Sequence, residues 1–174
     1  ETIQQRPVLF DGGIGTEIYA RGVFLNRCYE ELNLTRPGIV QEVQRAFLLA
    51  GAEAIETNTF GASRPRLEPH GLGERVRELN LEAARITREE VGDRAFVAGA
   101  VGPLGIRLEP WGPTSVDEAV GLFREQMLGL VEGGVDLLVL ETFSDLVEVQ
   151  AAVRAAKQTA PLPVVAMMTV DENG

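Results

Sequence analysis

Two acidic residues, far apart in the chain, each follow directly after an apolar run. Asp11 ends the run Val8-Leu9-Phe10, and Glu141 ends the run 135–140. Apolar runs that stop at polar residues are typical of buried strands that reach the edge of a sheet. Two carboxylates that meet at such an edge can hold a substrate ammonium group, or can act as an acid/base pair when one raises the pKa of the other.

The segment after Asp11 is rich in glycine and can bring its backbone close to a ligand. The N–H groups of Gly12 and Gly13 can hold a carboxylate or a phosphate. An Asp-Gly pair also occurs in ordinary turns, so this segment alone leaves a turn and a binding site as alternatives. The glycine spacing is neither G-x-G-x-x-G nor a P-loop, which disfavours nucleotide binding.

Two more predicted strands end in polar or glycine residues. Thr57 and Asn58 follow one of them, and Gly102 follows the other. We expect these three residues to help position a substrate at the same edge of the sheet. Glu56 and Thr57 point to opposite sides of their strand, and the sequence leaves open which of them faces the helices.

Apolar runs alternate with helical patterns along the chain, which predicts a parallel α/β sheet. The predicted strands are 7–10, 53–58, 95–101, 135–140 and 162–169, and the predicted long helices are 37–50, 72–91, 115–132 and 145–160. Two architectures fit: a doubly wound open sheet, or a (β/α)8 TIM barrel of which the chain supplies about five strands and four helices. We expect residues 1–174 to form part of one domain without an internal boundary. Because the chain stops just after a predicted strand, we also expect the protein to continue past Gly174.

The composition narrows the function classes. A formal net charge of -10 argues against nucleic acid or an anionic membrane surface as a partner. No apolar run has transmembrane length and residues 1–6 do not resemble a signal peptide, so we expect a cytoplasmic protein. The chain has one cysteine, Cys28, and one histidine, His70, which are too few for a thiolate-rich zinc site within it.

Five motifs occur in an order that is similar to a known family. They are Phe10-Asp11-Gly12-Gly13-Ile14-Gly15-Thr16, Cys28-Tyr29-Glu30-Glu31-Leu32-Asn33, Glu56-Thr57-Asn58-Thr59-Phe60-Gly61-Ala62, Val101-Gly102-Pro103 and Glu141-Thr142-Phe143. Together they resemble the homocysteine S-methyltransferase domain family, over essentially the whole chain. The resemblance implies a (β/α)8 barrel in which zinc activates the homocysteine thiol, whose thiolate then takes a methyl group from a donor to give methionine.

The resemblance also implies roles for residues of this chain. Asp11 and Glu141 would hold the substrate ammonium, and Gly12 and Gly13 its carboxylate, with Thr57, Asn58 and Gly102 positioning it. The cysteines that ligate zinc in the family fall beyond Gly174, so no residue of this chain is expected to be a metal ligand or a catalytic group.

The sequence does not identify the methyl donor or the other partners of the protein. Candidate methyl donors include folate, cobalamin, S-methylmethionine, S-adenosylmethionine and betaine, and further C-terminal domains are expected. The alternative to a methyltransferase is a non-catalytic module that binds a small zwitterion without metal.

Overall fold

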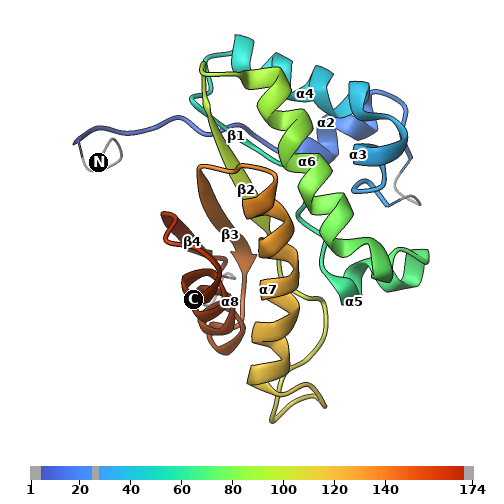
Figure 1. Cartoon of the computed structure of the whole chain (residues 1–174), viewed down its shortest axis with the longest axis vertical. Coiled ribbons are helices and arrows are strands. Elements are labelled where there is room, and N and C mark those ends of the chain that lie inside the picture. The colour runs from blue at the N-terminus through green and yellow to red at the C-terminus, as the bar shows by residue number, and fades with distance from the viewer. Residues whose placement is uncertain (1–4, 25–27, 171–174) are drawn as a thin grey trace.

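The computed structural model describes residues 5–24 and 28–170, which fold around one four-stranded parallel sheet (Figure 1). The strands are β1 (Ala54–Glu56), β2 (Phe96–Val101), β3 (Leu137–Phe143) and β4 (Val164–Met168). They lie in the order β1-β2-β3-β4, and all neighbours are parallel. The α/β class with a parallel sheet is therefore confirmed.

The prediction of a first strand at residues 7–10 is wrong. In this segment only Phe10 forms an isolated parallel bridge, to Ala54. Pro7 has no N–H to donate to a neighbour, and the glycines after Asp11 turn the chain away, which leaves too short a stretch to build a ladder. The segment is nevertheless fixed beside β1, since the Asp11 amide donates to the Ala54 carbonyl at 3.1 Å.

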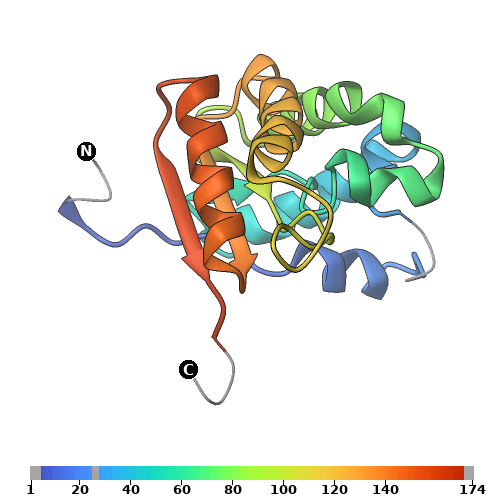
Figure 2. The same cartoon turned by 90° about the horizontal axis from the view of Figure 1, so that it is seen from below.

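Four long helices confirm the helical predictions. They are α4 (Pro37–Leu49), α6 (Val76–Val91), α7 (Val116–Glu132) and α8 (Leu146–Thr159). The helices pack side by side in chain order, as Figure 2 shows for α6, α7 and α8. The connections hold shorter helices that the pattern did not predict: α2 (Ile14–Ala20), α3 (Leu32–Thr35), α5 (Arg64–Leu67) and η1 (Glu68–His70). The first turn of the helix predicted at 72–91 is instead a separate 3-10 helix, η2 (Gly73–Arg75). Among the described residues, no helix combines the length and the apolar character needed to cross a membrane.

Both faces of the sheet are apolar, which explains the uninterrupted apolar runs. On one face, side chains such as Val97 and Leu138 belong to the large core that includes residues of α7 and α8. On the other face, Ala98, Leu137 and Val139 form a smaller cluster. Because side chains alternate between the two faces along each strand, only every second residue points away from the large core.

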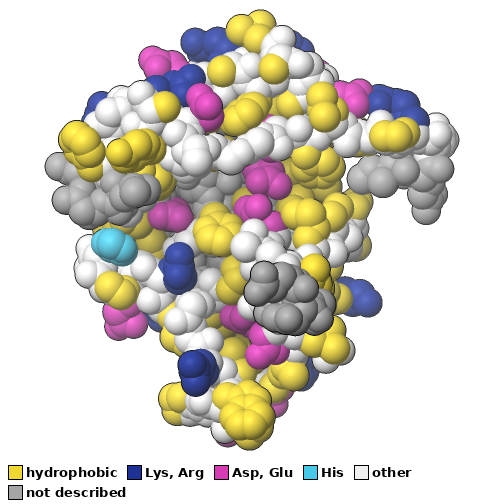
Figure 3. All heavy atoms as spheres, turned by 180° about the vertical axis from the view of Figure 1, so that it is seen from behind, with side chains coloured by type: hydrophobic (Ala, Val, Ile, Leu, Met, Phe, Trp, Pro, Cys, Tyr) yellow, Lys and Arg dark blue, Asp and Glu magenta, His cyan; other side chains and the backbone are white. Residues whose placement is uncertain are grey.

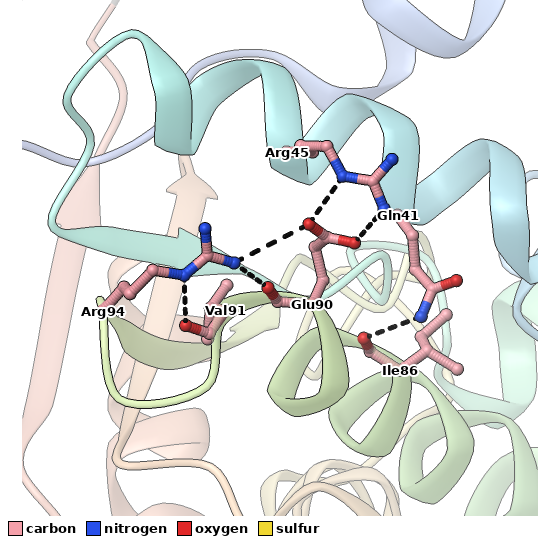
Figure 4. A network of polar contacts seen from close by, with 6 residues as sticks. All are labelled: Gln41, Arg45, Ile86, Glu90, Val91 and Arg94. Atoms are coloured by element: carbon pink, nitrogen blue, oxygen red, sulfur yellow. Dashed lines mark hydrogen bonds and ion pairs between the residues drawn. The ribbon is translucent and has the colours of Figure 1, made fainter.

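The end of α6 is tied to α4 by a network of polar contacts around Glu90 (Figure 4). Arg45 donates from Nε and Nη2 to the Glu90 carboxylate at 2.9 and 2.6 Å. Arg94 lies on the other side, donating to the carbonyls of Glu90 and Val91. The Glu90 side chain is only 7% exposed, so these arginines supply the partners that a buried carboxylate needs.

The start of α7 has a complete capping box. The Ser115 side chain accepts from the Glu118 amide, and the Glu118 carboxylate accepts from the Ser115 amide at 2.8 Å. We expect Ser115→Ala to lower the free energy of unfolding by about 1 kcal/mol, because these end groups of the helix lose their partners. Chemical denaturation measures this. The exposed Ser144→Ala should change little, and equal losses in the two variants would contradict the capping role.

Candidate functional site

A cavity of about 610 Å³ opens beside the carboxyl ends of β1 and β3. Acidic side chains lie in the middle of one face of the molecule, beside hydrophobic ones (Figure 3). Of the predicted site residues, the cavity is bordered by Asp11, Gly12, Gly13, Thr57, Asn58 and Glu141, and it also includes Glu56. Segments that are distant in the sequence thus meet at one place, as the strand-end pattern predicts.

Asp11 is held in place but is only partly satisfied. Its Oδ2 accepts a hydrogen bond from the Glu56 amide at 3.0 Å. Its Oδ1 is buried and has no hydrogen-bond partner within the described residues. Burial raises the pKa of Asp11 to about 7, against the opposing effect of the hydrogen bond from Glu56. An oxygen in this state would be stabilised by a donor or a positive charge on a ligand.

Glu56 is the site residue that sequence reasoning left undecided. Ile55 packs into the core on the helix side of β1, so Glu56 points to the opposite face, where the cavity lies. Burial and, after it, the nearby charges of Glu141 and Asp11 together raise the pKa of Glu56 to about 8. The period-two alternation from Ile55 was the signal that could have assigned it.

Glu141 lies at an irregularity in β3. The register between β3 and β4 shifts between Leu140 and Phe143, and Thr142 has a φ of 62°. A β-branched residue in the left-handed region is strained, at a cost of about 1–3 kcal/mol, and such bulges redirect side chains near functional sites. Glu141 borders the cavity, and burial raises the pKa of its carboxyl.

The three acids together give the cavity an unbalanced charge. Within the described part of the chain, none of Asp11, Glu56 and Glu141 forms an ion pair with Lys or Arg. Burial is the main cause of their raised pKa values, and repulsion from neighbouring carboxylates adds to it at Asp11 and Glu56. A small cation that entered the cavity would relieve this repulsion, and an ammonium group offers three hydrogen-bond donors.

Thr57 and Asn58 border the cavity, but their side chains are bonded to the protein. Thr59 Oγ1 donates its single proton to the Ala100 carbonyl at 2.7 Å, so Thr57 Oγ1 must be the donor in the 2.6 Å contact between the two hydroxyls. Thr57 Oγ1 also accepts from the Ala100 amide at 3.1 Å. The Asn58 amide donates to the Tyr29 carbonyl at 2.7 Å and to Asn33 Oδ1 at 3.1 Å. Both residues therefore shape the loop after β1.

We expect Thr57→Val to lower the free energy of unfolding by about 1–3 kcal/mol, because the buried Ala100 N–H would lose its partner. Thr57→Ser keeps the hydroxyl and should retain most of the stability. Denaturant unfolding of the two variants measures the difference. Wild-type stability in Thr57→Val would show that the hydroxyl network does not support the loop.

The glycines divide into two groups. Gly12 and Gly13 border the cavity, and within the described residues their amides donate to no protein acceptor, so both remain open to a ligand. Gly102 does not border it. Its amide donates to the Phe60 carbonyl at 3.1 Å, and a Cβ at this position would lie 2.5 Å from the Phe60 ring. The structure thus places Gly102 as a packing residue rather than a cavity residue.

No group of three or more His, Cys, Asp or Glu side chains that could hold a metal ion occurs among the described residues. Cys28 is buried, and its thiol donates to Glu30 Oε2 at 3.3 Å. Burial and the Glu30 charge raise the pKa of this thiol to about 12, whereas a metal-binding cysteine needs a depressed one. The described residues do not fit a zinc site.

Comparisons with known proteins agree on one family. A model of the homocysteine S-methyltransferase family matches residues 8–174. The chain is 32% identical to methionine synthase of Mycobacterium tuberculosis and 30% identical to that of Mycobacterium leprae, over an alignment 191 positions long in each case. Both alignments cover 100% of the chain and 16% of the relative, so the chain spans about a sixth of the length of these proteins.

Solved structures share the fold. The metallated form of the homocysteine methyltransferase MmuM from Escherichia coli superposes with a TM-score of 0.83 at 22% identity, covering 98% of this chain and 66% of that one. The oxidised form of the same enzyme gives a TM-score of 0.79 at 23% identity, covering 93% of this chain and 62% of that one. With the family match over nearly the entire chain, these likenesses lead to one conclusion: the chain belongs to the homocysteine S-methyltransferase family.

Proposed function

We propose that the protein is a homocysteine S-methyltransferase and that the cavity at the strand ends binds the amino-acid head of homocysteine. The observation that carries this proposal is the group of three carboxyls, Asp11, Glu56 and Glu141, which border one cavity without a counter-charge among the described residues. Membership of the family supports homocysteine as the substrate.

In this proposal the chain holds the substrate and leaves its sulfur free to react. The substrate ammonium lies between Asp11 and Glu141 and donates to the unpartnered Asp11 Oδ1. The amides of Gly12 and Gly13 face the substrate carboxylate, and Thr57 and Asn58 keep the loop in place. Such positioning fixes the thiolate relative to the donor, so that a sulfur–methyl bond forms as the bond between methyl and donor breaks.

Zinc, when bound, would lower the pKa of the homocysteine thiol. Because the described residues do not fit a zinc site, we propose that the cysteine ligands lie beyond Gly174. We also propose that residues 1–174 are the first part of a (β/α)8 barrel domain, since parallel strands with helices in chain order are the repeat of that fold. A cytoplasmic location, further domains and a folate or cobalamin methyl donor belong to the same proposal.

Formation of methionine from homocysteine by the whole protein tests the proposal, with candidate donors supplied in turn and the product measured by mass spectrometry. The alternative is a metal-free module that binds a zwitterion. It is favoured because the described residues contain no group of three or more side chains that could hold a metal ion. Calorimetry with homocysteine, before and after zinc removal, separates the two. Tight binding that is independent of zinc, without methionine from any donor, would support the alternative.

A further inference from the structure

A second cavity, of about 540 Å³, lies next to the first. The two cavities share Tyr29, Glu30 and Phe60 as bordering residues. The second cavity is also bordered by Arg66 of α5 and His70 of η1. An acidic cavity and a cavity with two basic side chains thus lie on either side of one shared wall.

Arg66 is packed against glycine backbone and carries an unbalanced charge. A Cβ at Gly105 would lie 2.9 Å from Arg66 Cδ and 3.0 Å from Nη1, so the Arg66 side chain lies directly against the Gly105 backbone. Many arginines of the chain pair with carboxylates, but Arg66 forms no ion pair within the described residues. Its guanidinium therefore keeps its donors for a ligand.

Glu30, the acidic residue of this cavity, lies near Arg66 beside Gly61 but forms no ion pair with it within the described residues. Glu30 Oε1 accepts from the Gly61 amide at 2.7 Å, and Oε2 accepts from the Cys28 thiol. These contacts direct the Glu30 carboxylate to its own loop and to the loop after β1. Arg66 and His70 remain as the groups that can recognise an anion, and a guanidinium matches a carboxylate in two parallel hydrogen bonds.

We propose that the second cavity binds a carboxylate of the methyl donor, with Arg66 as the main contact and His70 as a further one. Phe60 and Tyr29, on the shared wall, would contact the body of the donor, whose methyl group reaches the first cavity. The inference rests on the proposed function, because it assigns the first cavity to homocysteine. It names the substrate class as donors that carry a carboxylate.

Calorimetry of the whole protein, saturated with homocysteine, tests this with four probes. S-methylmethionine, betaine and 5-methyltetrahydrofolate carry a carboxylate, and trimethylsulfonium carries a methyl group without one. We expect at least one carboxylate donor to bind, and Arg66→Ala to weaken its binding about 10- to 100-fold, the effect of losing a charge-assisted pair. Arg66→Lys should give an intermediate loss, and trimethylsulfonium should bind equally to wild type and variant.

Arg124→Ala is the matched control, because Arg124 is an exposed arginine that forms no ion pair within the described residues and borders neither cavity. The inference is overturned if no carboxylate donor binds, if Arg66→Ala binds them as wild type does, or if it weakens trimethylsulfonium equally. Homocysteine binding should be unchanged in Arg66→Ala. If homocysteine fails to bind the wild type, the proposed function fails. Weaker binding of the carboxylate donor in Arg66→Ala, but not in Arg124→Ala, would still support the anion site.

Discussion

Asp11→Asn is expected to raise the KM for homocysteine about 10- to 100-fold, and Glu141→Gln should have a similar effect. Each substitution removes the charge from one partner of the substrate ammonium, and a hydrogen bond to a charged group contributes about 1.5–3 kcal/mol. Asparagine can still accept the hydrogen bond that the Glu56 amide gives to Asp11, so the local backbone should persist. Steady-state kinetics of the whole protein, with homocysteine varied, measure the change.

Two controls show whether this effect belongs to the ammonium. The zinc content should stay at the wild-type level in both variants, because neither residue is assigned to the metal. Glu89→Gln removes an exposed helix carboxylate that does not border the cavity and should leave the KM unchanged. Unchanged homocysteine kinetics in both Asp11→Asn and Glu141→Gln would refute the assignment of the ammonium site.

Binding of the amino-acid head is also expected to weaken as the pH falls from about 8 to about 6, by up to about tenfold per pH unit. The pKa of Asp11 is raised to about 7 and that of Glu56 to about 8, and burial raises the pKa of Glu141 as well. Protonation below these values removes the negative charge, while the ligand ammonium remains charged. Methionine is the suitable ligand for calorimetry, because it has no thiol that titrates in the same range.

Glu56→Gln separates this explanation from general acid sensitivity. Removal of the Glu56 charge relieves repulsion on its neighbours, so the pH profile should move to lower pH. Calorimetry in buffers of different ionisation enthalpy should also detect protons released on binding in the wild type. Affinity that is constant or rises toward low pH would be inconsistent with an ammonium held by these carboxyls.

The long helices were predictable because their signals are local. Ser115 and Glu118 form a capping box whatever the helix packs against, and Gly51 and Gly92 follow the ends of α4 and α6. The segment 7–10 was predicted wrongly because a strand exists only where a neighbour offers a ladder, and here only Phe10 is bridged.

The site was predictable in its location but not in its details. Acids and glycines that follow apolar runs had to gather at one edge of a parallel sheet, and Asp11 and Glu141 do. The positive φ of Thr142 has no local signal, since a β-branched residue disfavours that conformation. Likewise, only the fold reveals that Gly102 packs against Phe60, and that the Thr57 hydroxyl is committed to Ala100.

The central claim is that the cavity recognises an ammonium group through Asp11 and Glu141. Its most direct test compares homocysteine with 4-mercaptobutyrate, which has the same thiol and carboxylate but no ammonium, in binding to the wild type and to the variant Glu141→Gln. Wild-type protein should bind homocysteine about 10-fold or more tightly than 4-mercaptobutyrate. The variant should lose most of that preference, because 4-mercaptobutyrate has no ammonium group to contact the Glu141 carboxylate. An equal preference for homocysteine in both proteins would contradict the account.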